Sequence, residues 1–335
     1  MPNEEDNSAL MGSAQETHRR KAPLLSMVIP CYNEEPVISQ TATVLEDQLT
    51  ALMNTGDISS SSFVLFVDDG SSDRTWSIIE ELHAKNPTLY RGLKFSHNRG
   101  HQNAVYAGLI AALQHDCDAA ISMDADLQDD PDAIGRMVDS YRAGNEIVFG
   151  VRNNRENDTA FKHFTAEAFY KLMTWMGTDT IPDHADFRLM SRTAIAALSR
   201  YSESNLFLRG IVPSLGFTTD KVHYKRGVRV AGESKYPLSK MISFAMEGIT
   251  SFSVKPLHLV TVAGFISMLG SIAMLIYIIV SVAMGRAVSG WGSMMFSLWF
   301  LGGLILISLG IIGEYIGRIY LEAKNRPRYI IEKEL

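Results

Sequence analysis

The sequence predicts an α/β fold with a mostly parallel sheet, followed by interfacial helices and a two-helix transmembrane hairpin. Between residues 24 and 150, short apolar runs alternate with stretches of helical periodicity, which is typical of strands joined by crossover helices. Two of these runs end in acidic residues, Asp68 with Asp69 and Asp124 with Asp126. Further along, two apolar stretches each exceed the roughly 20 residues that a helix needs to span a bilayer.

Strands are predicted at residues 24–29, 63–67, 90–95, 119–123 and 146–150. Helices are predicted at residues 36–53, 75–84, 102–114, 131–143 and 161–176, with Ser72 or Asp73 as the N-cap of the second. Crossovers between parallel strands are right-handed, so the carboxyl ends of these strands share one edge of the sheet. We therefore expect both acidic strand ends and the loop at residues 97–101 to converge at that edge.

Composition narrows the class of protein. The polar residues 1–22 lack the apolar core of a signal peptide and are predicted to form a disordered tail. Cys31 and Cys117 are the only cysteines and lie far apart, which predicts reduced core residues in a reducing compartment rather than a disulfide framework. The net charge of −6 gives no indication of a nucleic-acid partner.

The apolar C-terminal part predicts a membrane hairpin. Arg286 is the only Lys, Arg, Asp or Glu between Lys255 and Glu314, and it separates predicted spans at residues 257–284 and 288–313, within a region at residues 256–317. The alternative is a pair of buried helices in a soluble protein. Basic residues flank the two outer ends of the hairpin, so the positive-inside rule predicts cytoplasmic termini, including a tail at residues 318–335.

The segment before the hairpin is amphipathic and then basic. Residues 236–255 have apolar side chains at helical spacing, which predicts juxtamembrane interfacial helices, or else helices packed on the soluble domain. Residues 221–240 carry six basic side chains and one acidic side chain, a local charge of about +5. This basic block indicates an anionic partner: a lipid phosphate held at a site, or anionic headgroups attracted without one.

Asp124 and Asp126 are the strongest candidates for chemistry. Alternate residues of an extended strand point to the same side, so both carboxylates would face one ligand. Oxygen ligands of this kind suit Mg²⁺ or Mn²⁺ bound together with a diphosphate, and the absence of a His/Cys cluster argues against zinc. An Asp-x-Asp pair alone occurs by chance in surface loops, but its place at the end of an apolar strand favours a metal site.

Other polar residues lie at the same predicted edge or further along the chain. Asp68 and Asp69 could accept hydrogen bonds from a base or a ribose, or could cap a helix. Arg99, flanked by two histidines, could pair with a diphosphate or lie in a solvated loop. In the polar cluster at residues 183–188, Asp186 could orient an acceptor with Arg188 bracing it; a helix N-terminus is the alternative.

Seven ordered strings resemble the family-2 glycosyltransferases of GT-A fold, specifically the polyprenyl-phosphate branch with the bactoprenol glucosyltransferases and dolichyl-phosphate mannose synthase. They are VIPCYNEE at 28–35, VDDGSSDRT at 67–75, NRGHQNAVYAGL at 98–109, MDADLQDDP at 123–131, DFRLMSR at 186–192, FLRGI at 207–211 and GESKYPLSKM at 232–241. The resemblance runs from about residue 24 to the C-terminus, and implies a Rossmann-like GT-A domain at residues 23–235. Asp130 stands where many relatives have proline, and the QxxRW string of processive synthases is absent.

The resemblance assigns roles to residues in these strings. The nucleotide sugar would be bound by Pro30, Tyr32, Glu34, Asp68, Asp69, Arg99, Gln102 and Asp124. Asp124 and Asp126 would hold the metal, and Asp186, Asp126 and Arg188 would form the catalytic group, with Asp186 at the position proposed for a base. The acceptor phosphate would be bound by Arg209, Arg226, Ser234, Lys235 and Tyr236.

The implied activity is transfer of a hexose from a nucleotide sugar to a polyprenyl phosphate. Glucose from UDP-glucose, undecaprenyl phosphate, inversion at the anomeric carbon and a Mg²⁺ or Mn²⁺ cofactor are the specific expectations, at the cytoplasmic membrane face and for cell-envelope glycan modification. A homo-oligomer in the bilayer and no nucleic-acid partner are also expected. Transfer of mannose, N-acetylglucosamine or formylated aminoarabinose is the alternative among enzymes. A membrane-anchored sugar-nucleotide sensor and a lipid flippase are the alternatives in other classes.

Overall fold

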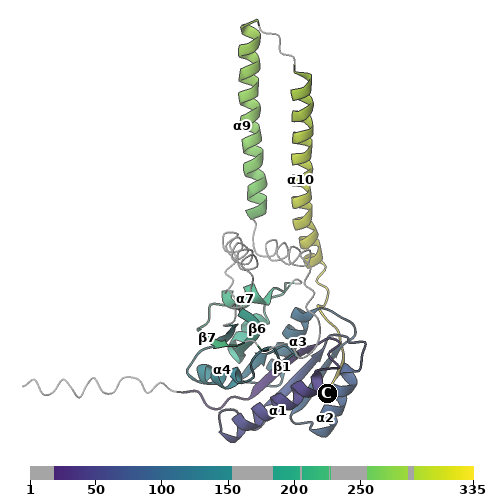
Figure 1. Cartoon of the computed structure of the whole chain (residues 1–335), viewed down its shortest axis with the longest axis vertical. Coiled ribbons are helices and arrows are strands. Elements are labelled where there is room, and N and C mark those ends of the chain that lie inside the picture. The colour runs from purple at the N-terminus through teal and green to yellow at the C-terminus, as the bar shows by residue number, and fades with distance from the viewer. Residues whose placement is uncertain (1–18, 153–183, 204–205, 226, 228–254, 286–289) are drawn as a thin grey trace, which may run out of the picture.

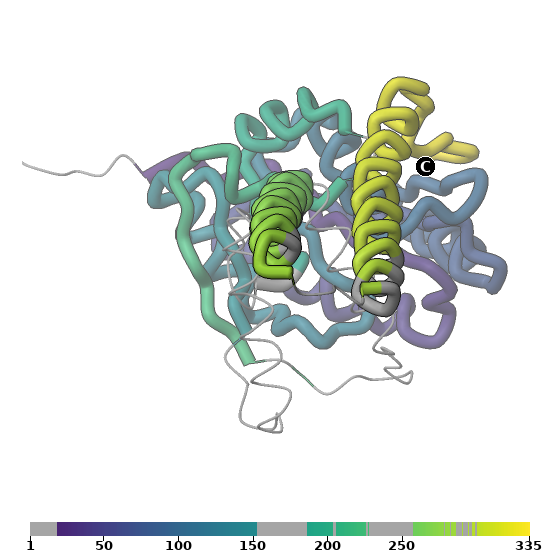
Figure 2. Tube along the Cα trace, turned by 90° about the horizontal axis from the view of Figure 1, so that it is seen from above, coloured from purple at the N-terminus to yellow at the C-terminus, as the bar shows by residue number. Residues whose placement is uncertain are grey.

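The computed structural model describes residues 19–152, 184–203, 206–225, 227, 255–285 and 290–335. Eight strands of these segments form one sheet in the order β7-β5-β6-β4-β1-β2-β3-β8. Helices cover both faces of the sheet, and two long helices rise together from one end of the domain (Figure 1). Figure 2 looks down these two helices, which stand side by side above the domain.

The sheet is mixed and mostly parallel, as the sequence predicts. Its four central parallel strands are β1 (Leu25–Cys31), β2 (Phe63–Asp68), β3 (Tyr90–Phe95) and β4 (Ala119–Ser122). Beyond β4, strand β6 (His184–Ser191) is antiparallel to both its neighbours, and β5 (Ile147–Arg152) pairs in parallel with β7 (Thr219–Tyr224). At the other edge, β8 (Ile331–Glu334) is antiparallel to β3.

The two faces of the sheet bury separate apolar cores. One core lies under α1 (Ile38–Asn54), α2 (Thr75–Lys85) and α4 (Ala133–Arg142), and the other under α3 (His101–Gln114), α6 (Arg192–Leu198) and α7 (Leu208–Ser214). Strand β2 shows why: its alternate side chains enter opposite cores, Val64 and Phe66 in the first and Phe63, Leu65 and Val67 in the second. This strand is buried on both faces and is therefore apolar from Phe63 to Val67, with Asp68 as its last residue.

The start of α2 differs from the prediction in one detail. The helix begins at Thr75 as expected, but its N-cap position is held by Arg74, not by Ser72 or Asp73. The Asp73 carboxylate still accepts hydrogen bonds from the N–H of Thr75 at 2.9 Å and from the N–H of Glu35 at 3.2 Å. It therefore joins the start of α2 to the loop after β1. The predicted helix at residues 161–176 lies outside the described residues.

The C-terminal residues add a strand that the sequence analysis did not predict. Strand β8 pairs with β3, and the N–H of Leu335 donates to the carbonyl of Gly92 at 2.9 Å. Just before it, the ring of Tyr329 stacks on Phe95 with centroids 4.9 Å apart. The predicted tail at residues 318–335 thus divides into the last turns of α10, a short connection and a sheet strand. The edge of β3 is covered as a result.

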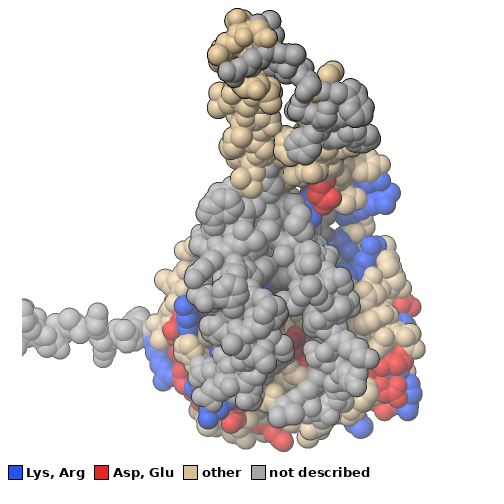
Figure 3. Space-filling view, turned by 45° about the horizontal axis from the view of Figure 1, so that its top comes forward, with Lys and Arg blue, Asp and Glu red and all other residues tan. Residues whose placement is uncertain are grey.

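The helices α9 (Lys255–Ala283) and α10 (Trp291–Ala323) are long and apolar enough to cross a membrane, at 257–281 and 300–323 respectively. The second stretch lies further along the chain than the predicted span at residues 288–313 and includes the charged residues Glu314 and Arg318. These two residues lie one helical turn apart and form an ion pair at 3.4 Å. Exposed apolar side chains cover both helices, and in Figure 3 the described part of the helices that lies far from the domain shows an uncharged surface. These features associate the chain with a membrane.

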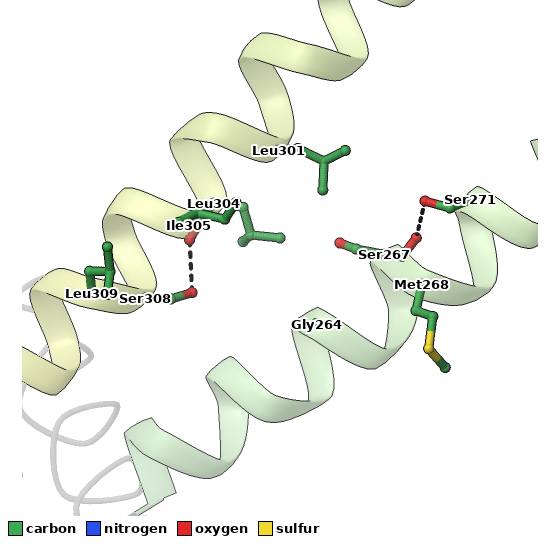
Figure 4. Close-up of a pocket in the computed structure, with 9 residues that line it drawn as sticks. All are labelled: Gly264, Ser267, Met268, Ser271, Leu301, Leu304, Ile305, Ser308 and Leu309. Atoms are coloured by element: carbon green, nitrogen blue, oxygen red, sulfur yellow. Dashed lines mark hydrogen bonds between the residues drawn. The ribbon is translucent and has the colours of Figure 1, made fainter.

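A cavity of about 370 Å³ lies between the two helices. Figure 4 shows its lining, which is made of small and apolar side chains from both helices. The hydroxyls of Ser271 and Ser308 donate to the carbonyls of Ser267 and Leu304 in the preceding turns. The hydroxyl hydrogens of these two serines are therefore already used within their own helices, and the cavity wall suits an apolar environment.

Close approach of α3 to the sheet depends on Gly108. A Cβ atom at this position would overlap Val28 Cγ1 and lie 3.0 Å from Val67 Cγ2. Gly108→Ala should therefore lower the free energy of unfolding by about 1–3 kcal/mol through overpacking, measured by thermal or denaturant unfolding of the purified protein.

Gly135 in α4 is a matched control for that substitution. A Cβ there would meet only Leu52 Cδ2, at an ordinary 3.5 Å. Gly135→Ala should be neutral or stabilise by up to about 1 kcal/mol, because alanine favours a helix. Equal unfolding midpoints for the two variants would contradict the packing argument.

Candidate active site

A polar pocket of about 350 Å³ opens at the carboxyl edge of the parallel strands, where the sequence predicts convergence. This volume is in the range of small-ligand sites. Its lining residues come from the end of β1 and the loop after it, the loops after β2, β3 and β4, the start of α3, strand β6 and helix α7: Pro30, Cys31, Tyr32, Glu34, Asp69, Asn98, Gly100, His101, Ala104, Asp124, Ala125, Asp126, Asp186 and Arg209.

The loop after β1 presents an aromatic face to the pocket. The side chain of Tyr32 is 48% exposed although it lines the pocket, so its ring can stack on a planar ligand such as a base. Asn33 follows with φ of 55°, and its side chain accepts a hydrogen bond from the N–H of Ser72 at 2.9 Å. The N–H of Glu34 donates to the hydroxyl of Thr75 at 2.9 Å. This loop is thereby fixed to the start of α2.

Asp68 and Asp69 have different surroundings. Asp69 lines the pocket, and its carboxylate accepts hydrogen bonds from the N–H groups of Arg99 at 2.6 Å and Gly100 at 2.8 Å. Asp68 is fully buried behind the pocket, where it accepts from the N–H of Ser71 at 3.1 Å. Burial raises the pKa of both carboxyls. The structure therefore places Asp69 in the candidate site, whereas Asp68 ends β2 and stabilises the turn that follows this strand.

Gly70 allows the loops after β2 and β3 to touch. It has φ of +68°, and a Cβ on it would lie 2.6 Å from the carbonyl carbon of His97 and 2.7 Å from the backbone nitrogen of Asn98. Only glycine fits such a contact without a shift of backbone. The side chain of Arg99 is exposed and is not part of the pocket lining, so in this structure the backbone of Arg99, rather than its guanidinium, contributes to the site.

Asp186 is the most strongly held acid in the pocket. It is 6% exposed and accepts hydrogen bonds from Arg188 Nη2 at 2.5 Å, Arg209 Nη2 at 3.1 Å and Gln102 Nε2 at 3.4 Å. Burial by itself would raise its pKa, but the hydrogen bond with His101 and the charges of Arg209 and Arg188 hold the pKa well below its usual range. Asp186 is therefore an ionised carboxylate and a very weak base.

The backbone explains why Asp186 reaches this place. Strand β6 runs antiparallel to β4 with Arg188 opposite Ser122, and the Ser122 hydroxyl donates to the carbonyl of Asp186 at 2.6 Å. The alternative of a helix N-terminus at residues 183–188 is wrong, because α6 begins only at Arg192, capped by the Ser191 side chain. Arg188 is fully buried and braces Asp186 from behind, and Gln102 lies beside it outside the pocket lining.

His101 is a pocket residue whose importance the sequence analysis underestimated. Its Nε2 lies 3.6 Å from Asp124 Oδ1 and 3.4 Å from Asp186 Oδ2. Burial lowers the pKa of its imidazole, but hydrogen bonding to Asp186 and the charge of Asp124 raise it by more, so the net shift is upward. A usable signal was present in the sequence: His101 is the first residue of a helix at the edge where the acids converge.

Asp124 and Asp126 have the chemistry of a hard-cation site. Burial raises the pKa of Asp124, and the nearby carboxylates of Asp129, Asp186 and Asp126 raise it further, against the effect of His101. Such crowded acids favour a bound cation, and their oxygens suit Mg²⁺ or Mn²⁺. Within the described segments no group of three potential ligand side chains lies close enough to complete a site alone. A cation would need further oxygen ligands, as Mg²⁺ usually takes from phosphates.

Four of the predicted acceptor residues, Arg226, Ser234, Lys235 and Tyr236, lie outside the described residues, as does most of the basic block. Arg209 is described, and it lines the pocket from α7 with its guanidinium bonded to Asp186. Its side chain is 36% exposed, so it also faces the opening of the site. The pocket thus contains the acidic pair Asp124 and Asp126, the hydrogen-bonded carboxylate of Asp186 and the guanidinium of Arg209.

The chain matches the model of the Glycosyl transferase family 2 over residues 26–199. It is 47% identical to the glycosyltransferase YkoT of Bacillus subtilis, over 95% of this chain and 94% of that protein. It is 40% identical to the bactoprenol glucosyl transferase of Shigella phage SfX, over 92% of this chain and 98% of that protein. A prophage bactoprenol glucosyl transferase homolog of Escherichia coli is 38% identical over 92% of this chain and 98% of that protein.

The mostly parallel sheet, with helices on both faces and acidic residues at its carboxyl edge, is the GT-A arrangement that the motifs imply. The relatives match over almost the whole chain, including the two apolar helices. The chain therefore belongs to glycosyltransferase family 2, in the branch that contains the bactoprenol glucosyltransferases.

Proposed function

We propose that this protein transfers glucose from UDP-glucose to undecaprenyl phosphate, with inversion at the anomeric carbon. The observation that carries the proposal is one pocket in which Asp124, Asp126, Asp186 and Arg209 converge, in a chain with two helices of membrane-spanning length. The bactoprenol glucosyl transferases among its relatives support glucose and a polyprenyl phosphate as substrates.

The donor would occupy the side of the pocket formed by the loops after β1, β2 and β3. Tyr32 would stack on the base, and Asp69 would bind the ribose or the base while keeping its two backbone hydrogen bonds. Asp124 and Asp126 would hold a divalent cation. When bound, such a cation neutralises charge that develops on a leaving diphosphate.

The acceptor chemistry needs little proton transfer. A phosphate monoester has a second pKa near 6, so it is largely ionised at cytosolic pH and already nucleophilic. Asp186, whose pKa is held well below its usual range, is a poor proton acceptor. We therefore assign it an orienting role: it holds Arg209 at the pocket, where the guanidinium can also bind the acceptor phosphate.

The acceptor is a lipid, so the pocket must reach the membrane surface. The basic residues at the outer ends of the hairpin favour cytoplasmic termini by the positive-inside rule. The soluble domain would then face cytosolic sugar nucleotides, and the GESKY segment at residues 232–236 would complete the acceptor site. Another sugar donor remains the rival among enzymes, since Tyr32 and Asp69 could bind more than one base.

A donor panel tests the proposal directly. Membranes with the overproduced protein are incubated with labelled UDP-glucose, GDP-mannose or UDP-N-acetylglucosamine, together with undecaprenyl phosphate and Mg²⁺ or Mn²⁺. A mild-acid-labile glycolipid should form from UDP-glucose. A glycolipid from another donor alone would correct the sugar, and nucleotide binding without any glycolipid would favour the sensor.

Removal of the cation should stop the reaction. Excess EDTA should abolish glycolipid formation, because Asp124 and Asp126 then repel the donor diphosphate, and added Mg²⁺ or Mn²⁺ should restore it. Heat-treated protein serves as the blank. Full activity in EDTA would remove the metal from the mechanism.

Two acidic substitutions separate the assigned roles. Asp126→Ala should abolish metal-dependent transfer. Asp186→Asn should lower the rate of transfer by less than the roughly 10²–10⁴-fold that follows the loss of a general base, because the acceptor phosphate needs no base. Initial rates at saturating Mn²⁺ provide the measurement, and equal losses in both variants would contradict this division.

Arg209→Gln should raise the KM for undecaprenyl phosphate about tenfold, since a charge-assisted hydrogen bond to phosphate is lost. The KM for the nucleotide sugar should change less. Arg192→Gln is the matched control, because the Arg192 side chain forms a surface ion pair with Asp116, at 2.7 Å, and does not line the pocket. An effect of Arg209→Gln on nucleotide affinity alone would overturn the assignment of Arg209 to the acceptor.

A further inference from the structure

A largely buried polar network lies directly behind the acidic motif. Asp129, three residues after Asp126, is 1% exposed. Its carboxylate accepts hydrogen bonds from the Tyr224 hydroxyl and from Arg152 Nη2, the latter at 3.2 Å, and Arg152 Nε donates to the Tyr224 oxygen at 3.2 Å. Three segments therefore meet at this network: the loop after β4, the end of β5 and the end of β7.

The sheet register places the two partners of Asp129 next to each other. Strands β5 and β7 are parallel, and their last pair in register is Arg152 with Tyr224. The aromatic ring of Tyr224 also packs edge-on against Phe187, with centroids 5.3 Å apart. Phe187 is the neighbour of Asp186 in β6. The network is thus anchored in the sheet, and the loop that carries Asp126 is held against this anchor.

The loop between Asp126 and Asp129 is strained. Leu127 has φ of +53°, a left-handed conformation that costs free energy for a residue other than glycine. Such conformations persist only where contacts with the surrounding structure stabilise them, and they cluster at functional sites. Three contacts hold this one: Gln128 N–H to Asp126 Oδ1 at 3.2 Å, Gly227 N–H to the carbonyl of Gln128 at 2.8 Å, and the Asp129 network.

Stability by itself explains the network poorly. Burying the Asp129 carboxylate, with the Arg152 guanidinium only partly buried beside it, has a desolvation cost, and apolar side chains of similar size often serve the fold as well or better. Among the described residues, Asp129 Oδ2 has no hydrogen-bond partner, which adds to that cost. A buried charge that is only partly compensated, beside a strained turn and a metal-type carboxylate, indicates a role in geometry.

We propose that Asp129, Arg152 and Tyr224 form a positioning network that holds the Asp126 carboxylate in its cation-binding orientation. The inference rests on the proposed function in that it takes Asp124 and Asp126 as cation ligands. None of the three residues lines the pocket, so each acts through the loop rather than on the substrate. The network also joins this loop to β7, whose continuation carries the basic block.

Tyr224→Phe and Tyr90→Phe form a matched pair for the test. Both tyrosines are buried in the same apolar core, and each donates its hydroxyl to a carboxylate, Tyr224 to Asp129 and Tyr90 to Glu46 at 2.8 Å. Each substitution removes one hydroxyl and leaves the ring. Tyr90 is the first residue of β3, and its hydroxyl donates to Glu46 and Ala42 of α1, whereas the hydroxyl of Tyr224 donates to Asp129 in the loop that carries Asp126.

The measurement is Mn²⁺ binding to the full-length purified protein in the presence of UDP, read from the EPR signal of free Mn²⁺. Tyr224→Phe should weaken Mn²⁺ binding about tenfold, the lower end of what lost outer-shell support costs. Tyr90→Phe should bind Mn²⁺ as the wild type does, although its unfolding midpoint falls by a similar amount. Equal Mn²⁺ affinities in both variants and the wild type would overturn the proposal, as would equal losses in both variants.

Asp129→Asn provides a second variant. It keeps an acceptor for Tyr224 but removes the charge that pairs with Arg152, and it should weaken Mn²⁺ binding at least as much as Tyr224→Phe does. If this variant does not fold, the tyrosine pair decides the outcome. If the wild-type protein forms no glycolipid but the variants show the predicted changes in Mn²⁺ affinity, the proposed function is refuted and the network is supported. If the wild type forms glycolipid but the variants bind Mn²⁺ as it does, the network is refuted and the proposed function stands.

Discussion

The carboxylate of Asp186 is the interaction on which the pocket depends. It is nearly buried, and a buried charge is tolerated only with close compensation. Arg188, fully buried, supplies that compensation from the core side, while Arg209 and His101 supply it from the pocket side. These contacts fix the direction of the Arg209 guanidinium and connect Asp186, through His101, to Asp124. The same interactions that allow the charge to be buried therefore set the geometry of the candidate site.

The two halves of the site are built differently. On the donor side, contacts to backbone groups fix two loops to each other: Asp69 accepts from two N–H groups of the loop after β3, and Gly70 lets that loop touch the loop after β2. Backbone contacts of this kind leave little freedom. On the other side, the loop that carries Asp126 is held by the partly buried side chain of Arg152 in β5 and the buried side chain of Tyr224 in β7. Along the chain, β7 is followed by the basic block and by residues 232–236, to which the motifs assign part of the acceptor site.

Two segments of the chain connect the domain to the two long helices, one before α9 and one after α10. The chain enters α9 after the basic block, and after α10 it returns to the sheet as β8. Arg328 packs over the ring of Tyr106 in α3 at 4.5 Å, and Tyr329 stacks on Phe95. Helix α3 begins at the pocket and is thus held near its middle by the segment that follows α10. This return fixes the domain relative to the hairpin more firmly than a single linker does.

The amino-acid pattern by itself determined the α/β class, the four central strands, the helices between them and the two apolar helices, because these depend on local periodicity and composition. It also predicted that Asp69, Asp124 and Asp126 meet at one edge, because parallel strands share the direction of their carboxyl ends. The antiparallel insertion of β6, the pairing of β8 with β3, the burial of Asp68 and the place of His101 between two acids were decided only by the tertiary structure. Each depends on which strands pair over long distances in sequence, and local periodicity carries no information about the partner.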